Sequence, residues 1–148
     1  MPTLFDGATR ESLQERLGAL DSGAAARWGK MTAPQMLCHV ADQMRVALGD
    51  VPAVAVPTLL RFKPVRWLFV DRLPWPKGRI PTAPEMQRTR PGEWADDLAA
   101  ARGLIDRFAT ASRTREWPVH PAFGRLSGDE WGSLSARHLD YHLQQFGA

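Results

Sequence analysis

Residues 131–146 of the chain read WGSLSARHLDYHLQQF. Three residues separate His138 from His142, and on an α-helix side chains four positions apart share one face, with Cβ atoms about 5–6 Å apart. Trp131 and Leu134 extend the same face in steps of three and four toward the start of the segment. We therefore expect a C-terminal helix that carries both imidazoles on or beside its inward-facing stripe.

A pair of imidazoles that points into a protein interior has two interpretations. When charged they repel each other, and when neutral each of them costs free energy on losing water. A bound divalent metal removes both problems, because neutral imidazole is a common metal ligand. The alternative is that His138 and His142 are core-edge residues, each satisfied by an ordinary hydrogen bond. The spacing of His138 and His142 alone does not distinguish between these two interpretations.

Length and composition predict one helical domain over residues 1–148. A chain of 148 residues suits one domain with a full core. An apolar content of 44% and a charged content of 24% are typical of a globular protein. Helix-forming residues dominate, and alternating runs of β-branched residues are absent. The predicted fold class is therefore all-α.

The single cysteine, Cys38, excludes an intramolecular disulfide and a cysteine-rich zinc module. A metal site here would need histidine and carboxylate ligands. Cys38 itself is read as small packing material, with a reactive thiol as the alternative. The start of the chain has no basic, apolar signal segment, and no apolar run is long enough to span a bilayer, so we expect a cytoplasmic protein without a membrane partner.

Apolar periodicity and capping residues predict four long helices, over residues 9–20, 33–48, 91–111 and 127–146. Thr9 is a candidate N-cap of the first helix. Thr32 with Gln35, and Ser127 with Glu130, have the spacing of capping boxes at the starts of the second and fourth helices.

Residues 50–90 form a long, proline-rich crossover between the second and third helices. A short helix over residues 58–71 is predicted there, followed by extended or turning chain over 73–85. Residues 51–90 carry eight basic and two acidic side chains, net +6. The crossover is expected either to attract an anionic ligand over a site or to be a solvated connection. The short helix should pack Leu59, Leu60, Trp67, Leu68 and Val70 onto the bundle.

A third histidine, His39, lies at the edge of the apolar stripe of residues 33–48. Gln35, one turn earlier, or Asp42, one turn later, could orient its ring. Taken alone, a histidine in such a place is more often a satisfied core residue than a metal ligand.

Three segments together resemble one family: RWGKMTAPQMLCH at residues 27–39, HPAFG at 120–124 and HLDYHLQQFG at 138–147. The chain resembles the DinB/YfiT-like superfamily, bacterial four-helix bundles of up-down-down-up topology with a long crossover. The sequence of these segments is most similar to a branch of the superfamily that is described only as a domain of unknown function. The resemblance implies that His39, His138 and His142 bind one divalent metal ion, zinc or nickel.

The resemblance also implies a metal-dependent enzyme that acts on a small-molecule substrate, either a thiol-dependent transferase using a low-molecular-weight thiol or a hydrolase-like enzyme. His120, Arg137 and Gln35 are candidates for auxiliary roles, with Arg137 and the basic crossover holding an acidic substrate or thiol. His120 has a second interpretation, as a residue that binds the backbone of its own loop.

Two other functions are weighed against this one. The first is a non-catalytic DinB-like helical module that acts through homodimerisation or a partner. The second is nucleic-acid binding, which we do not expect, because the basic residues are not interleaved with aromatic residues on a helix.

Overall fold

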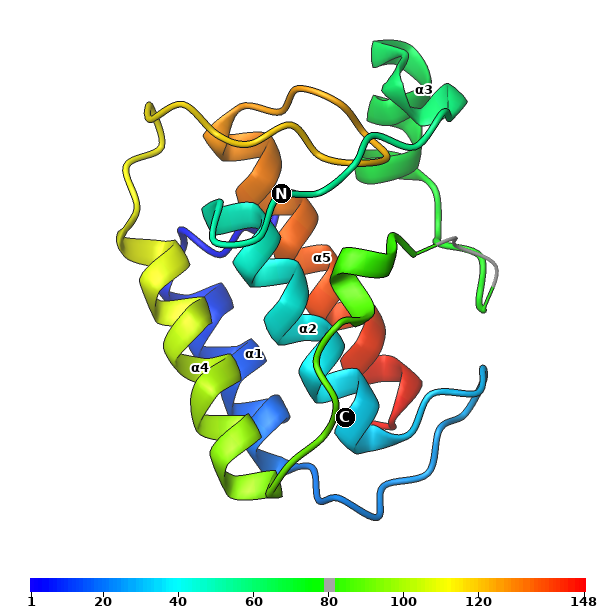
Figure 1. Cartoon of the computed structure of the whole chain (residues 1–148), viewed down its shortest axis with the longest axis vertical. Coiled ribbons are helices and arrows are strands. Elements are labelled where there is room, and N and C mark those ends of the chain that lie inside the picture. The colour runs from blue at the N-terminus through cyan, green and yellow to red at the C-terminus, as the bar shows by residue number, and fades with distance from the viewer. Residues whose placement is uncertain (79–81) are drawn as a thin grey trace.

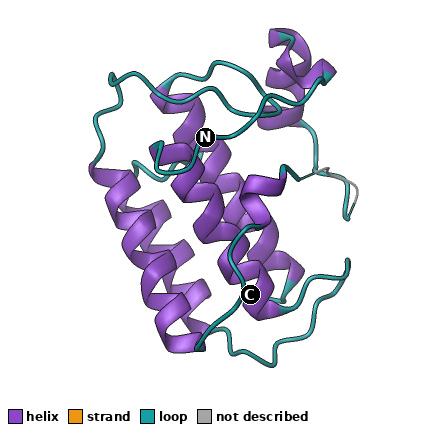
Figure 2. Ribbon diagram, viewed as in Figure 1, coloured by secondary structure: helices purple, strands orange, loops and turns teal. Residues whose placement is uncertain are grey.

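The computed structural model describes residues 1–78 and 82–148, and every regular element in them is helical (Figures 1 and 2). The all-α prediction is confirmed to that extent. Four of the five α-helices have 13 to 18 residues, and the fifth, α3, has 5. The α-helices are α1 (Gly7–Ala19), α2 (Ala33–Leu48), α3 (Lys63–Trp67), α4 (Trp94–Thr110) and α5 (Gly128–Gln145).

The starts of α2 and α5 follow the predicted capping boxes. The Thr32 hydroxyl accepts from the Gln35 N–H at 3.3 Å, and the Gln35 side chain accepts from the Thr32 N–H at 2.9 Å. Ser127 caps α5 in the same reciprocal way. The predicted cap of α1 was wrong: Asp6 is its N-cap and accepts from the Thr9 N–H at 2.8 Å, so the helix begins two residues earlier.

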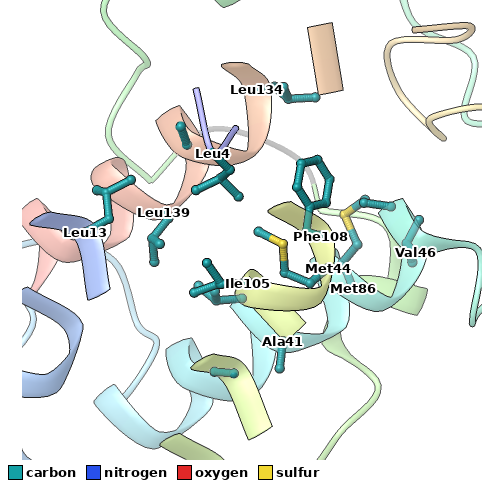
Figure 3. Packing of buried hydrophobic residues seen from close by; sticks show 14 of the residues in the cluster. Leu4, Leu13, Ala41, Met44, Val46, Met86, Ile105, Phe108, Leu134 and Leu139 are labelled. Atoms are coloured by element: carbon teal, nitrogen blue, oxygen red, sulfur yellow. The ribbon is translucent and has the colours of Figure 1, made fainter. Parts of the chain in front are cut away.

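The four long helices pack against one another around one apolar core. α2 contacts α4 and α5, and α1 contacts α5 and α4. Figure 3 shows side chains from these helices meeting in the core, with the loop residue Leu4 and the crossover residue Met86 beside them. Fully buried members include Leu17, Met44, Ile105, Phe108 and Leu139. Burial of large apolar side chains contributes about 1.5–3 kcal/mol each and holds the helices together.

The crossover carries part of the helix predicted over 58–71, as an unbroken helical run from Lys63 to Arg72 that a separate 3-10 turn precedes. Its elements are η1 (Leu59–Arg61), α3, η2 (Leu68–Arg72) and η3 (Pro84–Gln87). Pro64 lies in the first turn of α3, where its missing N–H is tolerated, and a helix that had started at residue 58 could not run through it. The extended or turning chain expected over 73–85 is confirmed for residues 73–78 and 82–83, η3 begins at Pro84, and residues 79–81 of that prediction lie outside the described residues.

The apolar residues of the predicted crossover helix are mostly not buried. Leu59 is 83% exposed, Trp67 53% and Leu68 43%, whereas Val70 is buried. Leu60 is partly buried against the core, so the expected packing onto the bundle is confirmed for Leu60 and Val70 and was wrong for the other three.

A buried arginine fastens α3 to the loop that precedes α5. The Arg66 guanidinium donates to the carbonyl oxygens of Phe123 and Arg125 at 3.1 and 2.9 Å and to the Glu130 carboxylate at 2.7 Å. Charge-assisted bonds of this kind are about twice as strong as neutral ones. The crossover is thus held across the end of the bundle despite its exposed apolar side chains. No helix among the described residues is long and apolar enough to cross a bilayer.

Candidate metal centre

Three imidazoles from two helices meet at one point of the bundle. His39 comes from the middle of α2, and His138 and His142 lie one turn apart on α5. The ring centroids of His39 are 4.8 Å from those of both His138 and His142, and the latter two rings are 4.6 Å apart. One nitrogen from each ring can be chosen so that all three lie within 4.8 Å of one another. The structure thus brings together the three ligands that the resemblance implies.

A backbone carbonyl sets the tautomer of His39. Its Nδ1 lies 2.6 Å from the Met86 carbonyl oxygen, which can only accept, so Nδ1 carries the hydrogen. Met86 belongs to η3, which packs on α2. His39 Nε2 therefore carries a lone pair, and it lies 2.9 Å from His138 Nε2.

A side-chain amide orients His142 in the same way. The Nδ1 atom of His142 lies 2.8 Å from Gln145 Oε1 and donates to it. The Gln145 amide nitrogen in turn donates to the Trp28 carbonyl oxygen at 2.8 Å, which fixes which end of the amide faces the histidine. His142 Nε2 is left with a lone pair. Partners of this kind on the outer nitrogen are typical of metal-binding histidines.

His138 has no such outer partner. Its Nε2 lies 2.9 Å from His39 Nε2, and its buried Nδ1 has no hydrogen-bond partner among the described residues. Because His39 Nε2 carries a lone pair, His138 Nε2 either donates to it or shares an ion with it. In the second case the His138 hydrogen moves to Nδ1.

Burial keeps all three rings neutral near pH 7. Loss of water lowers the pKa of His39 below its usual value of 6.5. Burial and the neighbouring His142 and His39 rings lower the pKa of His138 well below that value. Burial, with a smaller effect of His39, lowers the pKa of His142 to about 3. Neutral imidazole is the form that binds metals, so none of the three must lose a proton on binding.

The donor atoms are close enough for one divalent ion to bind after small shifts of the rings. Zinc–imidazole bonds of about 2.0–2.1 Å in a tetrahedron put donor nitrogens about 3.4 Å apart. This value lies between the 2.9 Å of the closest pair and the 4.8 Å that bounds the three. Among the described residues the group contains three ligands and no fourth His, Cys, Asp or Glu. Three protein ligands are typical of a catalytic centre, which keeps one position open.

His120 lies outside the three-histidine group and binds its own loop. Its Nδ1 accepts from the backbone N–H groups of Ala122 and Phe123 at 3.0 and 3.1 Å. Its ring packs against the rings of Phe123 and Trp131, and burial lowers its pKa to about 3. These contacts agree with the backbone-binding interpretation of His120.

The other two auxiliary candidates have structural partners. Gln35 is engaged in the capping box of α2. Arg137 donates to the carbonyl oxygens of Val70 and Leu73, and its guanidinium lies 5.4 Å from the centre of the Trp75 ring, so it fastens the crossover to α5.

The expectation that Gln35 or Asp42 orients His39 was wrong. Asp42 instead accepts from the backbone and the hydroxyl of Thr89 and from Arg45. The orienting groups that sequence reasoning missed are the Met86 carbonyl and Gln145. The i, i+3 spacing of His142 and Gln145 was a usable signal, whereas no side-chain pattern marks a backbone carbonyl in a crossover.

Two of the cavities that adjoin the three-histidine group are lined by more than one of its members. One of about 420 Å³ is lined by all three of them, together with Trp75 and Tyr141. The other, of about 300 Å³, is lined by His39 and His138 and reaches His120. The open side of the three-histidine group therefore faces space that a small molecule can enter.

A family model described as a protein of unknown function, DUF1569, matches residues 8–148. No curated protein and no solved structure matches the chain. The prediction of a family of unknown function is confirmed, and the match names no wider superfamily.

Proposed function

Since the chain belongs to the DUF1569 family of proteins of unknown function, we propose a function from its own residues: it is a metal-dependent enzyme that acts on a small molecule. His39, His138 and His142 would hold one divalent ion, zinc or nickel. One observation carries the proposal: three neutral imidazoles direct ring nitrogens at one point beside a cavity.

The fixed tautomers of His39 and His142 favour a role in metal binding over a role as ordinary buried core residues. A core histidine needs one hydrogen bond, but here two outer nitrogens are engaged so that both inner nitrogens offer lone pairs to the same point. Without an ion, His138 Nε2 can donate its hydrogen to only one of these two lone pairs, whereas a cation can bind all three nitrogens. The contacts of Met86 and Gln145 are thus best explained as outer supports of a metal centre.

When bound, such an ion supplies Lewis acidity toward a carbonyl or a water molecule, or holds a thiolate. The chain's own residues keep the ligands neutral and orient two of them. The reaction is hydrolase-like or a thiol-dependent transfer. Cys38 is not the thiol, because burial and the neighbouring Asp97 raise its pKa to about 11, and its sulfur lies 3.7 Å from the Asp97 carboxylate. A transferase would need a low-molecular-weight thiol.

We further propose that the chain is a single domain of the DinB/YfiT-like superfamily, with its four long helices in up-down-down-up order. Four long helices, a crossover after the second and a His-x3-His pair on the last support this assignment. Comparison with an experimental structure would test it, and a different helix order would contradict it.

Metal analysis of protein purified without an affinity tag tests the metal centre. After dialysis against equimolar zinc or nickel, the wild-type chain should retain one ion per chain by mass spectrometry. A His138→Ala, His142→Ala double variant should retain none. Equal metal content in both proteins would contradict the proposal. His120→Ala is the matched control, because it removes a buried histidine outside the group and should leave the metal content unchanged.

A helical module that acts through self-association is the second candidate. The exposed apolar side chains of Leu59, Phe62, Trp67 and Leu68 gather in one segment and favour a contact surface. Sedimentation measures the mass in solution, with Phe62→Ser as the variant that should weaken association. A strictly monomeric protein that carries one ion per chain would exclude this function.

A further inference from the structure

The cavity of about 300 Å³ beside His39 and His138 differs in the charge of its lining from the cavity of about 420 Å³ that all three histidines line. Its walls include Val56 and Leu60 from the crossover and Phe123 from the loop before α5. Among the described residues no Asp, Glu, Lys or Arg lines it. The acidic substrate expected from the basic crossover would find no counter-charge here, and an ion would lose its water without compensation.

One residue that lines this cavity, Gln43, has a buried polar atom without a hydrogen-bond partner among the described residues. Gln43, one turn beyond His39 on α2, is 2% exposed and lines the cavity. Its amide nitrogen donates to the Ser135 hydroxyl at 3.1 Å, whereas its buried Oε1 has no partner among the described residues. A buried carbonyl oxygen without a partner costs about 1–3 kcal/mol, so this acceptor needs a donor from a ligand or water.

A second polar side chain of this cavity offers a hydrogen-bond donor. His120 also lines the cavity, and its Nδ1 is occupied by two backbone N–H groups. The hydrogen of the neutral ring is therefore on Nε2, for which no acceptor is found among the described residues. The residues that line the cavity thus offer one acceptor and one donor.

We propose that this cavity binds an uncharged amide with a mainly apolar body. The amide N–H donates to Gln43 Oε1, and the amide carbonyl accepts from His120 Nε2. A carboxylate of the same shape fails, because it has no hydrogen for Gln43 and carries a charge into an uncharged cavity. A hydrocarbon fills the space but leaves both polar groups without a partner.

The location makes this amide the substrate class of the proposed enzyme. His39 and His138 line the same cavity, so a ligand there lies beside the three-histidine group. This substrate class rests on the proposed metal centre. Recognition uses Gln43 and His120 instead of the ion, so binding can be measured without metal.

Calorimetry with three probes of similar size tests the inference: benzamide, benzoate and ethylbenzene. We expect benzamide to bind the metal-free chain in EDTA at least tenfold more tightly than benzoate or ethylbenzene, as one or two satisfied hydrogen bonds predict. Benzoate that binds as tightly as benzamide, or the absence of benzamide binding, would overturn the inference.

Three variants locate the binding. Gln43→Met keeps the side-chain length and should weaken benzamide binding about tenfold. Gln144→Met, which changes an exposed glutamine on α5, should leave it unchanged. Ala122→Leu fills the cavity from a partly exposed position and should abolish binding while the far-ultraviolet circular dichroism stays the same. Unchanged affinity in Ala122→Leu would contradict the site even if Gln43→Met failed to fold.

The two proposals fail separately. If zinc binds stoichiometrically but benzamide does not bind, the amide site is wrong and the metal centre stands. If benzamide binds and zinc does not, the amide site stands as a binding site and the metal-dependent function is wrong.

Discussion

The three imidazoles differ in what holds their outer nitrogens. A carbonyl fixes His39 and an amide fixes His142, but the His138 Nδ1 has no partner among the described residues. His39 and His142 therefore have one tautomer with or without an ion, and His138 is the ring whose hydrogen must move when an ion binds. A hydrogen-bond partner on the outer nitrogen fixes the orientation of the ring and thereby raises its affinity for a metal ion.

Loss of the Gln145 amide should weaken metal binding without abolishing it. In Gln145→Leu the His142 ring loses its acceptor and its fixed orientation, and zinc affinity should fall about 10–100-fold. Competition with a chromogenic chelator measures this change. Gln144→Leu, one residue earlier on the exposed side of α5, should bind zinc as the wild type does. Equal affinity in the two variants would show that Gln145 does not support a ligand.

Acid should destabilise the metal-free chain through its buried histidines. The His120 pKa is about 3 in the folded chain and 6.5 when unperturbed, so between these values the unfolded chain binds more protons. The free energy of unfolding therefore falls as the pH drops from about 6.5 toward 3, and each such group contributes at most about 1.4 kcal/mol per pH unit. Above pH 6.5 this contribution is constant.

A His120→Asn variant isolates that residue. The Asn carbonyl can replace Nδ1 as the acceptor for the loop N–H groups, but it does not titrate. Urea unfolding in EDTA at pH 7 and pH 5 should show a smaller loss of stability in His120→Asn than in the wild type. A loss of the same size in both would mean that His120 is not held neutral.

At the scale of elements, the helices that carry the ligands could be predicted because their signals are local. Thr32 with Gln35 and Ser127 with Glu130 mark the starts of α2 and α5, and apolar periodicity gives their faces. The three histidines follow from those faces together with the resemblance. Local signals of this kind need no knowledge of the fold.

The crossover could not be predicted in the same way, because distant contacts decide its course. Arg66 binds carbonyl oxygens of a loop about sixty residues later in the chain, and Met86 reaches His39 through its backbone. Neither contact leaves a pattern in the sequence. The outer support of His39 and the cavities beside the histidines depend on this segment, so they could not be predicted from the sequence.

Removal of the Arg137 clamp should loosen the crossover beside the metal centre. Arg137→Met keeps the aliphatic stem but removes both bonds to the carbonyl oxygens of Val70 and Leu73. Hydrogen bonds from a charged group contribute about 1.5–3 kcal/mol, so amide exchange over residues 68–75 should accelerate at least tenfold. Hydrogen exchange followed by mass spectrometry measures the change.

Arg72→Met is the matched control for this segment. The exposed Arg72 lies 5.0 Å from the centre of the Trp67 ring, a contact worth about 0.5–1 kcal/mol at an exposed site. Exchange should change little in this variant. Equal acceleration in both variants would mean that Arg137 does not hold the crossover.

At the scale of the whole molecule, metal binding should stabilise the fold, because the ligands come from α2 and α5 and unfolding separates them. Free zinc at one hundred times its dissociation constant adds about 2.7 kcal/mol to the free energy of unfolding. For a chain of this length that corresponds to a rise in Tm of about 5–10 °C. Calorimetry should show the rise in the wild type and none in the His138→Ala, His142→Ala variant.

X-ray absorption at the zinc edge reports the atoms that surround the ion in the loaded wild-type chain. We predict about three nitrogen neighbours at about 2.0–2.1 Å, with the outer scattering typical of imidazole rings, and one further light-atom neighbour. A sulfur neighbour at about 2.3 Å, or a shell of oxygen atoms without imidazole scattering, would contradict a centre built from His39, His138 and His142.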